Sequence, residues 1–150
     1  MSEKKFEIQP EKKFQVNYEY KRYSDNSLLA HVEPIQEGML DPESSDRKIE
    51  TLVEYPLLEV AKSFMLKGIK TYSSSANKND IKNREAYIIL HFYSLSENNK
   101  IIAERYKVYE QQSYKIEKLV KISVAVNKNT TVGEIRSKFE KIVAMFESQV

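Results

Sequence analysis

The sequence contains no cysteine and no tryptophan, and it has only three glycines, four prolines and two histidines among its 150 residues. The lack of cysteine excludes disulfides, thiolate metal sites and cysteine catalysis. The scattered glycines leave no glycine-rich loop of the kind that binds phosphates. Because a chain without cysteine is compatible with a reducing compartment, we expect a cytoplasmic protein.

Long apolar runs and a large excess of one charge are also missing. No run approaches the roughly 20 residues that a membrane-spanning helix needs, and the first residues are too charged for a secretory signal, so we expect no membrane partner. The 24 basic and 22 acidic residues give a net charge of +2, which does not require a polyanionic partner. The balance of 41% hydrophobic and 31% charged residues is that of a globular chain. We expect one domain over residues 1–150, with residues 1–13 as a loose arm.

Three closely spaced runs in the second half of the chain have β-type composition: Ala86–Ser94, Lys100–Tyr109 and Tyr114–Asn127. Apolar and polar residues alternate in them, as in half-buried strands. The short polar groups Ser96–Asn99 and Glu110–Ser113 indicate tight reversals between the runs. Neighbouring strands joined by short turns form an antiparallel meander.

Further strands are expected earlier in the chain. Phe14–Tyr20 alternates aromatic and β-branched residues with polar ones. A turn-rich group follows, and Leu28–Glu33 is expected to return as the second strand of a hairpin. Gln36–Asp46 is expected to be a surface loop. Ile69–Ser73 is short and β-branched, which predicts another strand.

The last part of the chain, Thr131–Ser148, has a strongly amphipathic helical pattern. Thr131 and Glu134 have the spacing of a capping box, in which the threonine hydroxyl and the glutamate carboxylate each accept a hydrogen bond from the other residue's backbone N–H. The apolar stripe of this helix includes Phe139. We expect it to cover one face of the sheet.

A central helix is predicted over Pro56–Lys67, with Gly68 placed for a left-handed carboxyl-terminal cap. Pro56 either begins this helix or kinks a longer one that starts at Ser45 or Asp46. If Pro56 begins it, Lys48–Tyr55 is a candidate extended segment.

These elements predict an α+β fold. An antiparallel sheet, made of the meander of three C-terminal strands and the N-terminal hairpin, packs against the C-terminal helix and one central helix. Even-numbered apolar residues of the last three runs are expected to face the core, among them Ile88, Leu90, Ile116 and Ile122. The order of the strands does not follow from the sequence.

No catalytic or metal-binding pattern stands out. His31 and His91 lie in separate predicted strands without neighbouring ligands at metal-binding spacing. Carboxylates such as Glu54 and Glu59 are expected to be solvated surface charges. We therefore expect no catalytic residue, no metal and no cofactor, and this favours a non-enzymatic protein.

The odd-numbered residues of the predicted sheet form a candidate binding face of aromatic and basic side chains. Its members are Tyr87, His91, Tyr93, Arg105, Lys107, Tyr109 and Lys121. Aromatic rings stack on unpaired bases and basic side chains bind phosphates, which is the chemistry of single-stranded nucleic-acid recognition. The alternative interpretation, which we favour, is that the tyrosines are half-buried at the edge of the fold.

A second candidate site is a serine- and asparagine-rich loop after the predicted strand Ile69–Ser73. Its candidate ligand-binding residues are Ser73, Ser74, Ser75, Asn77 and Lys78. Short hydroxyl and amide side chains can converge on phosphate or sugar oxygens, but they also simply stabilise turns, and the turn is the favoured interpretation.

The sequence therefore leads to three functional hypotheses. The first is a non-enzymatic protein-interaction module, such as an adaptor, inhibitor or assembly factor, with another protein as its partner and homo-oligomers left open. The abundance of lysine, asparagine, isoleucine and tyrosine hints at a phage or mobile element of a low-GC bacterium. The second is a single-stranded nucleic-acid-binding protein that uses the odd-numbered face. The third is a small-molecule-binding domain that uses the serine- and asparagine-rich loop.

Overall fold

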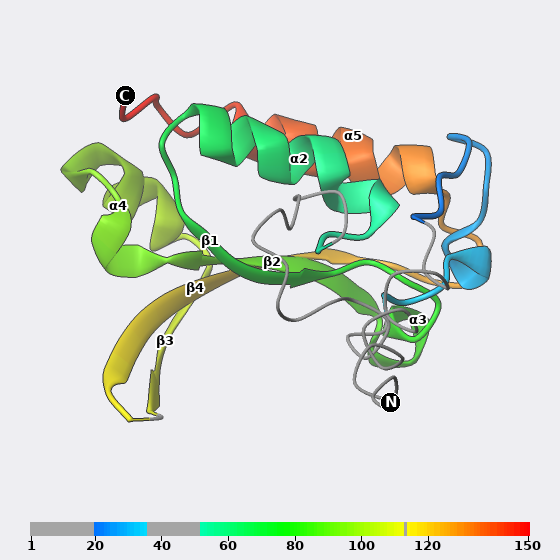
Figure 1. The fold of residues 1–150 in the computed structure, drawn as a ribbon, viewed down its shortest axis with the longest axis horizontal. Helices are drawn as coiled ribbons and strands as arrows, with labels where there is room; N and C mark the ends of the chain where they lie inside the picture. Colours follow the sequence, from blue (N-terminus) through cyan, green and yellow to red (C-terminus); the bar gives the residue numbers. More distant parts are fainter. Residues whose placement is uncertain (1–19, 36–51, 113) are drawn as a thin grey trace, which may run out of the picture.

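The computed structural model describes residues 20–35, 52–112 and 114–150. Within these residues, four antiparallel strands form one sheet, and two helices cover one of its faces (Figure 1). This confirms the predicted α+β class. In chain order the elements are the 3₁₀ turn η2 (Leu29–His31), α2 (Tyr55–Leu66), β1 (Thr71–Ser75), α3 (Asp80–Asn83), β2 (Glu85–His91), the 3₁₀ turn η5 (Phe92–Ser94), α4 (Glu97–Ala103), β3 (Lys107–Gln112), β4 (Ile116–Ala125) and α5 (Val132–Val143).

The strands lie in the order β1-β2-β4-β3. β2 pairs with β4, and β3 lies on the other side of β4, so the predicted meander is wrong. The chain passes through η5 and α4 between β2 and β3, which takes it to the far edge of the sheet. The β3–β4 hairpin extends beyond the layer formed by α2 and α5 (Figure 1).

The predicted strand Lys100–Tyr109 is helical in its first part. The hydroxyl of Ser96 accepts a hydrogen bond from the backbone N–H of Asn99 at 3.3 Å, so Ser96 is the amino-terminal cap of α4. The group Ser96–Asn99, predicted as a reversal, therefore begins a helix. Only from Lys107 onward is the chain extended, as β3.

Other boundaries also shift. β2 ends at His91, because the chain turns in η5 where the prediction continued the strand to Ser94. β3 runs through Gln112, past the start of the predicted reversal Glu110–Ser113. The predicted strand Phe14–Tyr20, except for Tyr20 itself, lies outside the described residues. The same holds for the predicted loop Gln36–Asp46 and for the possible helix start at Ser45 or Asp46.

The segment Leu28–Glu33 is not the strand of a hairpin. Leu28 makes only an isolated antiparallel bridge with Thr131, and Leu29–His31 form η2. The backbone N–H of Val132, in the first turn of α5, donates a hydrogen bond to the Ser27 carbonyl, just before this segment, at 2.8 Å. The segment therefore holds the start of α5.

The two long helices have the expected ends. α2 begins at Tyr55 with Pro56 in its first turn, so Pro56 begins the helix and does not kink a longer one. Gly68 follows α2 with φ of 78°, the left-handed conformation expected for a carboxyl-terminal cap. The capping box of Thr131 and Glu134 at the start of α5 is confirmed.

The core lies between the sheet and the helix pair α2 and α5. Phe64 of α2 meets Phe146, which follows α5, edge to face with ring centres 5.4 Å apart. Predicted core residues on the even-numbered face are buried, among them Ile88, Leu90, Val120 and Ile122. Val124 is half-buried, and Ile116 is 61% exposed. Ile116 begins β4 in the hairpin that extends beyond α2 and α5, so neither of these helices covers it.

Candidate functional site

The sheet face opposite α2 and α5, called the outer face below, carries most of the predicted aromatic and basic residues. Lys107 of β3 lies directly opposite Lys121 of β4. Tyr87, His91 and Tyr109 occupy positions of the same parity in their strands, so they lie on the same face. The structure therefore brings five of the seven predicted residues together.

The cations of the outer face are already engaged with neighbours. Lys121 Nζ donates a hydrogen bond to Glu85 and lies 4.5 Å from the centre of the Tyr87 ring. This hydrogen bond raises the pKa of Lys121 and lowers the pKa of Glu85. Lys107 Nζ lies 5.9 Å from the centre of the Tyr109 ring. A phosphate at this face would compete with an existing carboxylate, which weakens the case for nucleic acid.

The surroundings of His91 on the outer face disfavour its charged form. Burial, together with the nearby Lys70, lowers the pKa of His91 below its ordinary value. Its ring meets that of Tyr72 edge to face at 5.2 Å, and the Tyr72 hydroxyl accepts a hydrogen bond from Gln111 at 2.8 Å. These contacts resemble structural packing more than an open stacking platform.

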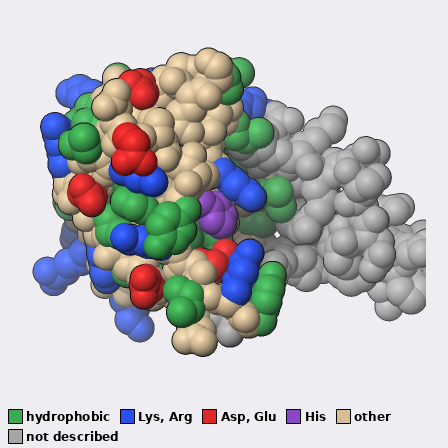
Figure 2. Space-filling view, turned by 90° about the vertical axis from the view of Figure 1, so that its left-hand side faces the viewer, with side chains coloured by type: hydrophobic (Ala, Val, Ile, Leu, Met, Phe, Trp, Pro, Cys, Tyr) green, Lys and Arg blue, Asp and Glu red, His purple; other side chains and the backbone are tan. Residues whose placement is uncertain are grey.

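Two of the predicted residues lie elsewhere. Tyr93 is in η5, is 68% exposed, and has Lys100 and Lys118 at 6.0 Å and 5.7 Å from its ring centre. Arg105 is exposed in the connection between α4 and β3. Figure 2, which looks at this end of the molecule, shows hydrophobic side chains surrounded by both basic and acidic ones. No uniformly positive surface joins these residues to the outer face in that view.

The serine- and asparagine-rich segment forms internal contacts. The Ser75 hydroxyl donates to the Asp80 carboxylate at 2.7 Å, and the backbone N–H of Asn77 donates to the same group at 2.8 Å. Lys78 forms an ion pair with Glu33 at 3.1 Å. Ser73, Ser74 and Ser75 belong to β1, so the predicted loop begins only after Ser75, and the polar groups of Ser75, Asn77 and Lys78 are engaged within the chain.

Glu54 is the centre of this polar network, and the sequence analysis missed it. Its buried carboxylate accepts hydrogen bonds from the backbone N–H groups of Ile35 at 2.9 Å and Ala76 at 2.8 Å. The Asn77 side-chain amide donates to both carboxylate oxygens, at 2.9 Å and 3.0 Å. No lysine, arginine or histidine among the described residues lies within ion-pair distance of it. This Glu54 clasp joins three chain segments at the start of α2.

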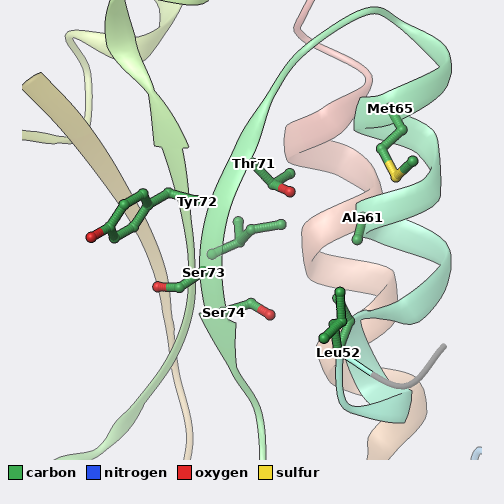
Figure 3. Close-up of a pocket in the computed structure, with 9 residues that line it drawn as sticks. Leu52, Ala61, Met65, Thr71, Tyr72, Ser73 and Ser74 are labelled. Atoms are coloured by element: carbon green, nitrogen blue, oxygen red, sulfur yellow. The ribbon is translucent and has the colours of Figure 1, made fainter. Parts of the chain in front are cut away.

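A groove of about 480 Å³ lies between α2 and β1. Its lining residues are Leu52, Val53, Ala61, Met65, Thr71, Tyr72, Ser73, Ser74 and Ile88. Figure 3 shows Thr71 and Ser74 pointing toward α2, whereas Tyr72 and Ser73 point away from it. The facing side chains Ala61, Thr71 and Ser74 are small, so they do not fill the space between the helix and the strand.

Large apolar side chains border the groove and are exposed. Leu52 is 48% exposed and Met65 is 54% exposed. Met65 lies at the Thr71 end of the groove and Leu52 at the Ser74 end (Figure 3). Exposed apolar side chains gathered around a depression are typical of binding sites.

The strand beside the groove is an edge of the sheet. Within the described part of the sheet, β1 has a paired neighbour, β2, on one side only. β1 reads TYSSS and carries no charged side chain, whereas the opposite edge strand, β3, carries the exposed Lys107 and Glu110. Charged residues on an edge strand hinder pairing with another chain. β1 lacks this protection by charge, although its register with β2 shifts between Thr71 and Ser73, so Ser73–Ser75 is its regularly paired part.

The described residues offer little else that indicates chemistry. They contain no group of three or more histidine, aspartate or glutamate side chains that could hold a metal ion. None of their helices combines the length and the apolar character needed to cross a bilayer. Comparison of the chain with protein-family models, curated proteins and solved structures finds no match.

Of the residues that line the groove, only Ser73 and Ser74 were predicted as ligand candidates, whereas Leu52, Ala61 and Met65 on the helix side were not. One feature of the sequence does indicate this groove. A helix whose apolar residues continue to Met65 is followed by a short strand of small residues.

Proposed function

We propose that the chain is a protein-interaction module that binds an extended segment of a partner protein along β1, in the groove between β1 and α2. The observation that supports this most is the combination of an uncharged edge strand with an apolar groove directly beside it. Adding a strand to a sheet edge gives affinity through backbone hydrogen bonds, and pockets for alternate side chains give selectivity. We place this module in the cytoplasm.

The lining of the groove favours a peptide over a phosphate-bearing ligand. Of the described residues that line it, none is charged, and the polar side chains that face α2 are those of Thr71 and Ser74. The volume of about 480 Å³ lies in the range of roughly 300–1,000 Å³ that ligand pockets occupy. It accommodates two or so apolar side chains of an extended segment. Met65 and Leu52 would cover these side chains from the helix side.

A peptide selection tests the proposal. Random linear peptides displayed on phage are selected on the full chain and counter-selected on Ser74→Trp, which places an indole in the groove. Ser137→Trp, at an exposed position of α5, is the matched control. We expect peptides that bind the wild type and the control but not Ser74→Trp. Met65→Gln, at a rim residue that is 54% exposed, serves as a second groove variant with little risk to folding.

The mode of binding is tested on the selected peptides. N-methylation of alternate backbone amides removes hydrogen-bond donors from one edge of a strand only. We expect one methylation pattern to abolish binding and the other pattern to keep it, because one edge of the peptide pairs with β1. Equal effects of both patterns would contradict strand addition.

Two results would overturn the proposal as a whole. One is a selection that yields only peptides which bind Ser74→Trp as well as the wild type. This result is expected if another part of the same chain fills the groove. The Tyr20 hydroxyl already donates a hydrogen bond to the carbonyl of Val53, which is one of the lining residues. The other is a dimer, measured by sedimentation, that Ser74→Trp dissociates and Ser137→Trp does not, because the occupant would then be a second copy.

A further inference from the structure

The groove between α2 and β1 has two chemically different ends. The chain turns back after α2, so the carboxyl-terminal end of the helix lies beside the start of β1 (Figure 3). Met65 and Thr71 mark this first end, and Leu52 and Ser74 mark the second. A bound segment would therefore meet a different charge environment at each of its own ends.

The Thr71 end is positive. Lys70 immediately precedes β1, is exposed, and forms no ion pair with any described carboxylate. The Lys70 carbonyl accepts a hydrogen bond from the His91 backbone N–H at 3.1 Å, so Lys70 lies opposite His91, on the outer-face side of this end of β1. Lys67 is also close, but its ammonium donates to the carbonyls of Val143 at 3.1 Å and Phe146 at 2.6 Å. Among the described residues, Lys70 is thus the cation at this end of β1 that has no carboxylate partner.

The Ser74 end is negative. The carboxylates of Glu54 and Asp80 lie just past this end, and neutral donors surround both of them. Within the described part of the chain, neither carboxylate forms an ion pair. The nearby Lys78 is matched by Glu33. The charge along β1 therefore changes from positive at the Lys70 end to negative at the Glu54 end.

The direction of the bound segment follows from strand pairing. Every strand pair in the described sheet is antiparallel, and antiparallel pairing is slightly more stable per residue than parallel pairing. A segment antiparallel to β1 enters at Ser74 and leaves at Thr71. Its carboxyl-terminal side therefore reaches Lys70.

Building on the proposed function, we infer that the partner segment is an extended, antiparallel strand with apolar side chains at alternate positions, followed on its carboxyl-terminal side by acidic residues that meet Lys70. The same acidic residues at the amino-terminal side would face Glu54 and Asp80. The charges at the two ends of β1 thus select both the composition and the direction of the segment.

Three fluorescein-labelled peptides test this inference. Each has the same core of alternating valine and threonine, with two glutamates after the core, two glutamates before it, or two glutamines after it. Binding to the full chain is measured by fluorescence anisotropy. We expect the peptide with carboxyl-terminal glutamates to bind about two- to fivefold more tightly than the neutral one, the usual effect of an exposed ion pair. The preference should shrink at high salt.

Charge reversal assigns the effect to one residue. Lys70→Glu should reverse the preference between the acidic and the neutral peptide. Lys128→Glu, at an exposed position in the loop before α5, is the matched control and should leave it unchanged. Binding of none of the three peptides would overturn the proposed function together with the inference. Equal binding of all three, or a preference for amino-terminal glutamates, would overturn the inference alone.

Discussion

Replacement of Glu54 by alanine should strongly destabilise the fold, although the residue lies at the start of a helix and belongs to no ion pair among the described residues. Its carboxylate satisfies the backbone N–H groups of Ile35 and Ala76 and the side-chain amide of Asn77. The positive end of the α2 dipole contributes to its stability in this position. The substitution removes the acceptor from all three donors at once.

The magnitude follows from how well each donor is buried. The hydrogen bonds from Ala76 and Asn77 are buried, while that from Ile35 is only partly buried, so water can replace the acceptor for Ile35 alone. A buried donor left without a partner costs about 1–3 kcal/mol. Two such donors give about 2–6 kcal/mol, a large part of a total stability that is typically about 5–15 kcal/mol.

Glu54→Gln should cost less than Glu54→Ala. The glutamine side chain keeps one oxygen acceptor, but its NH₂ group must face at least one of the N–H groups that now donate to the carboxylate. We expect a loss of about 1–2 kcal/mol. The order of stability is therefore wild type, then Glu54→Gln, then Glu54→Ala.

Guanidinium unfolding measures these changes. Because the chain has ten tyrosines and no tryptophan, tyrosine fluorescence and circular dichroism are suitable as the two probes. Glu59→Ala, in the exposed part of the same helix, is the matched control and should stay within about 0.5 kcal/mol of the wild type. A double-mutant cycle with Asn77→Ala should show less than additive loss, because the unsatisfied amide is then gone. A Glu54→Ala protein as stable as the control would refute the reasoning.

Further changes test other parts of the structure. Phe139→Ala removes a fully buried ring and should lower the unfolding free energy by about 3–5 kcal/mol, and an unchanged melting temperature would show that α5 does not close the core. Thr131→Ala should cost about 1 kcal/mol by chemical unfolding, through loss of the cap. A hydrogen bond from Arg136 lowers the pKa of Asp25, so the stabilisation by this pair is complete above the unfolded pKa and is lost as the pH falls through the folded one. Arg136→Gln should therefore weaken the acid dependence of unfolding measured between neutral and low pH. Oligo-dT should not bind in anisotropy titrations at physiological salt, because Lys121 is already paired, and micromolar binding would contradict this.

The amphipathic patterns predicted the layers of the fold but not the order of the strands. α5 and α2 were predictable because caps and apolar stripes are local features of Thr131, Pro56 and Gly68. The group Ser96–Asn99 was misread because serine and asparagine favour turns and helix caps alike. What decides between them is tertiary: the Asn99 side chain donates to the Glu147 carbonyl at 2.9 Å, near the end of the described chain.

The candidate site depended even more on contacts between distant segments. Glu54 reads as a surface charge in the sequence, and only the approach of Ile35 and Asn77 makes it a buried acceptor. The odd-numbered residues of β2 and β4 were grouped correctly, because alternation within a strand fixes the face. Tyr93 and Arg105 were not, because neither lies in a strand.

The strand order β1-β2-β4-β3 has a consequence for folding kinetics. The β3–β4 hairpin pairs residues close in sequence, such as Gln112 with Ile116, and such hairpins form within microseconds. β2 can join β4 only after the intervening chain through α4 and β3 has closed a loop, which carries an entropic cost. β1 pairs with β2 across a shorter loop, with Ser75 opposite Tyr87, so the β2–β4 pairing is the non-local step that joins two local hairpins. Substitutions that weaken the β2–β4 pairing should chiefly accelerate unfolding if this step comes after the folding transition state, and should slow folding, with high φ-values, if it belongs to that state.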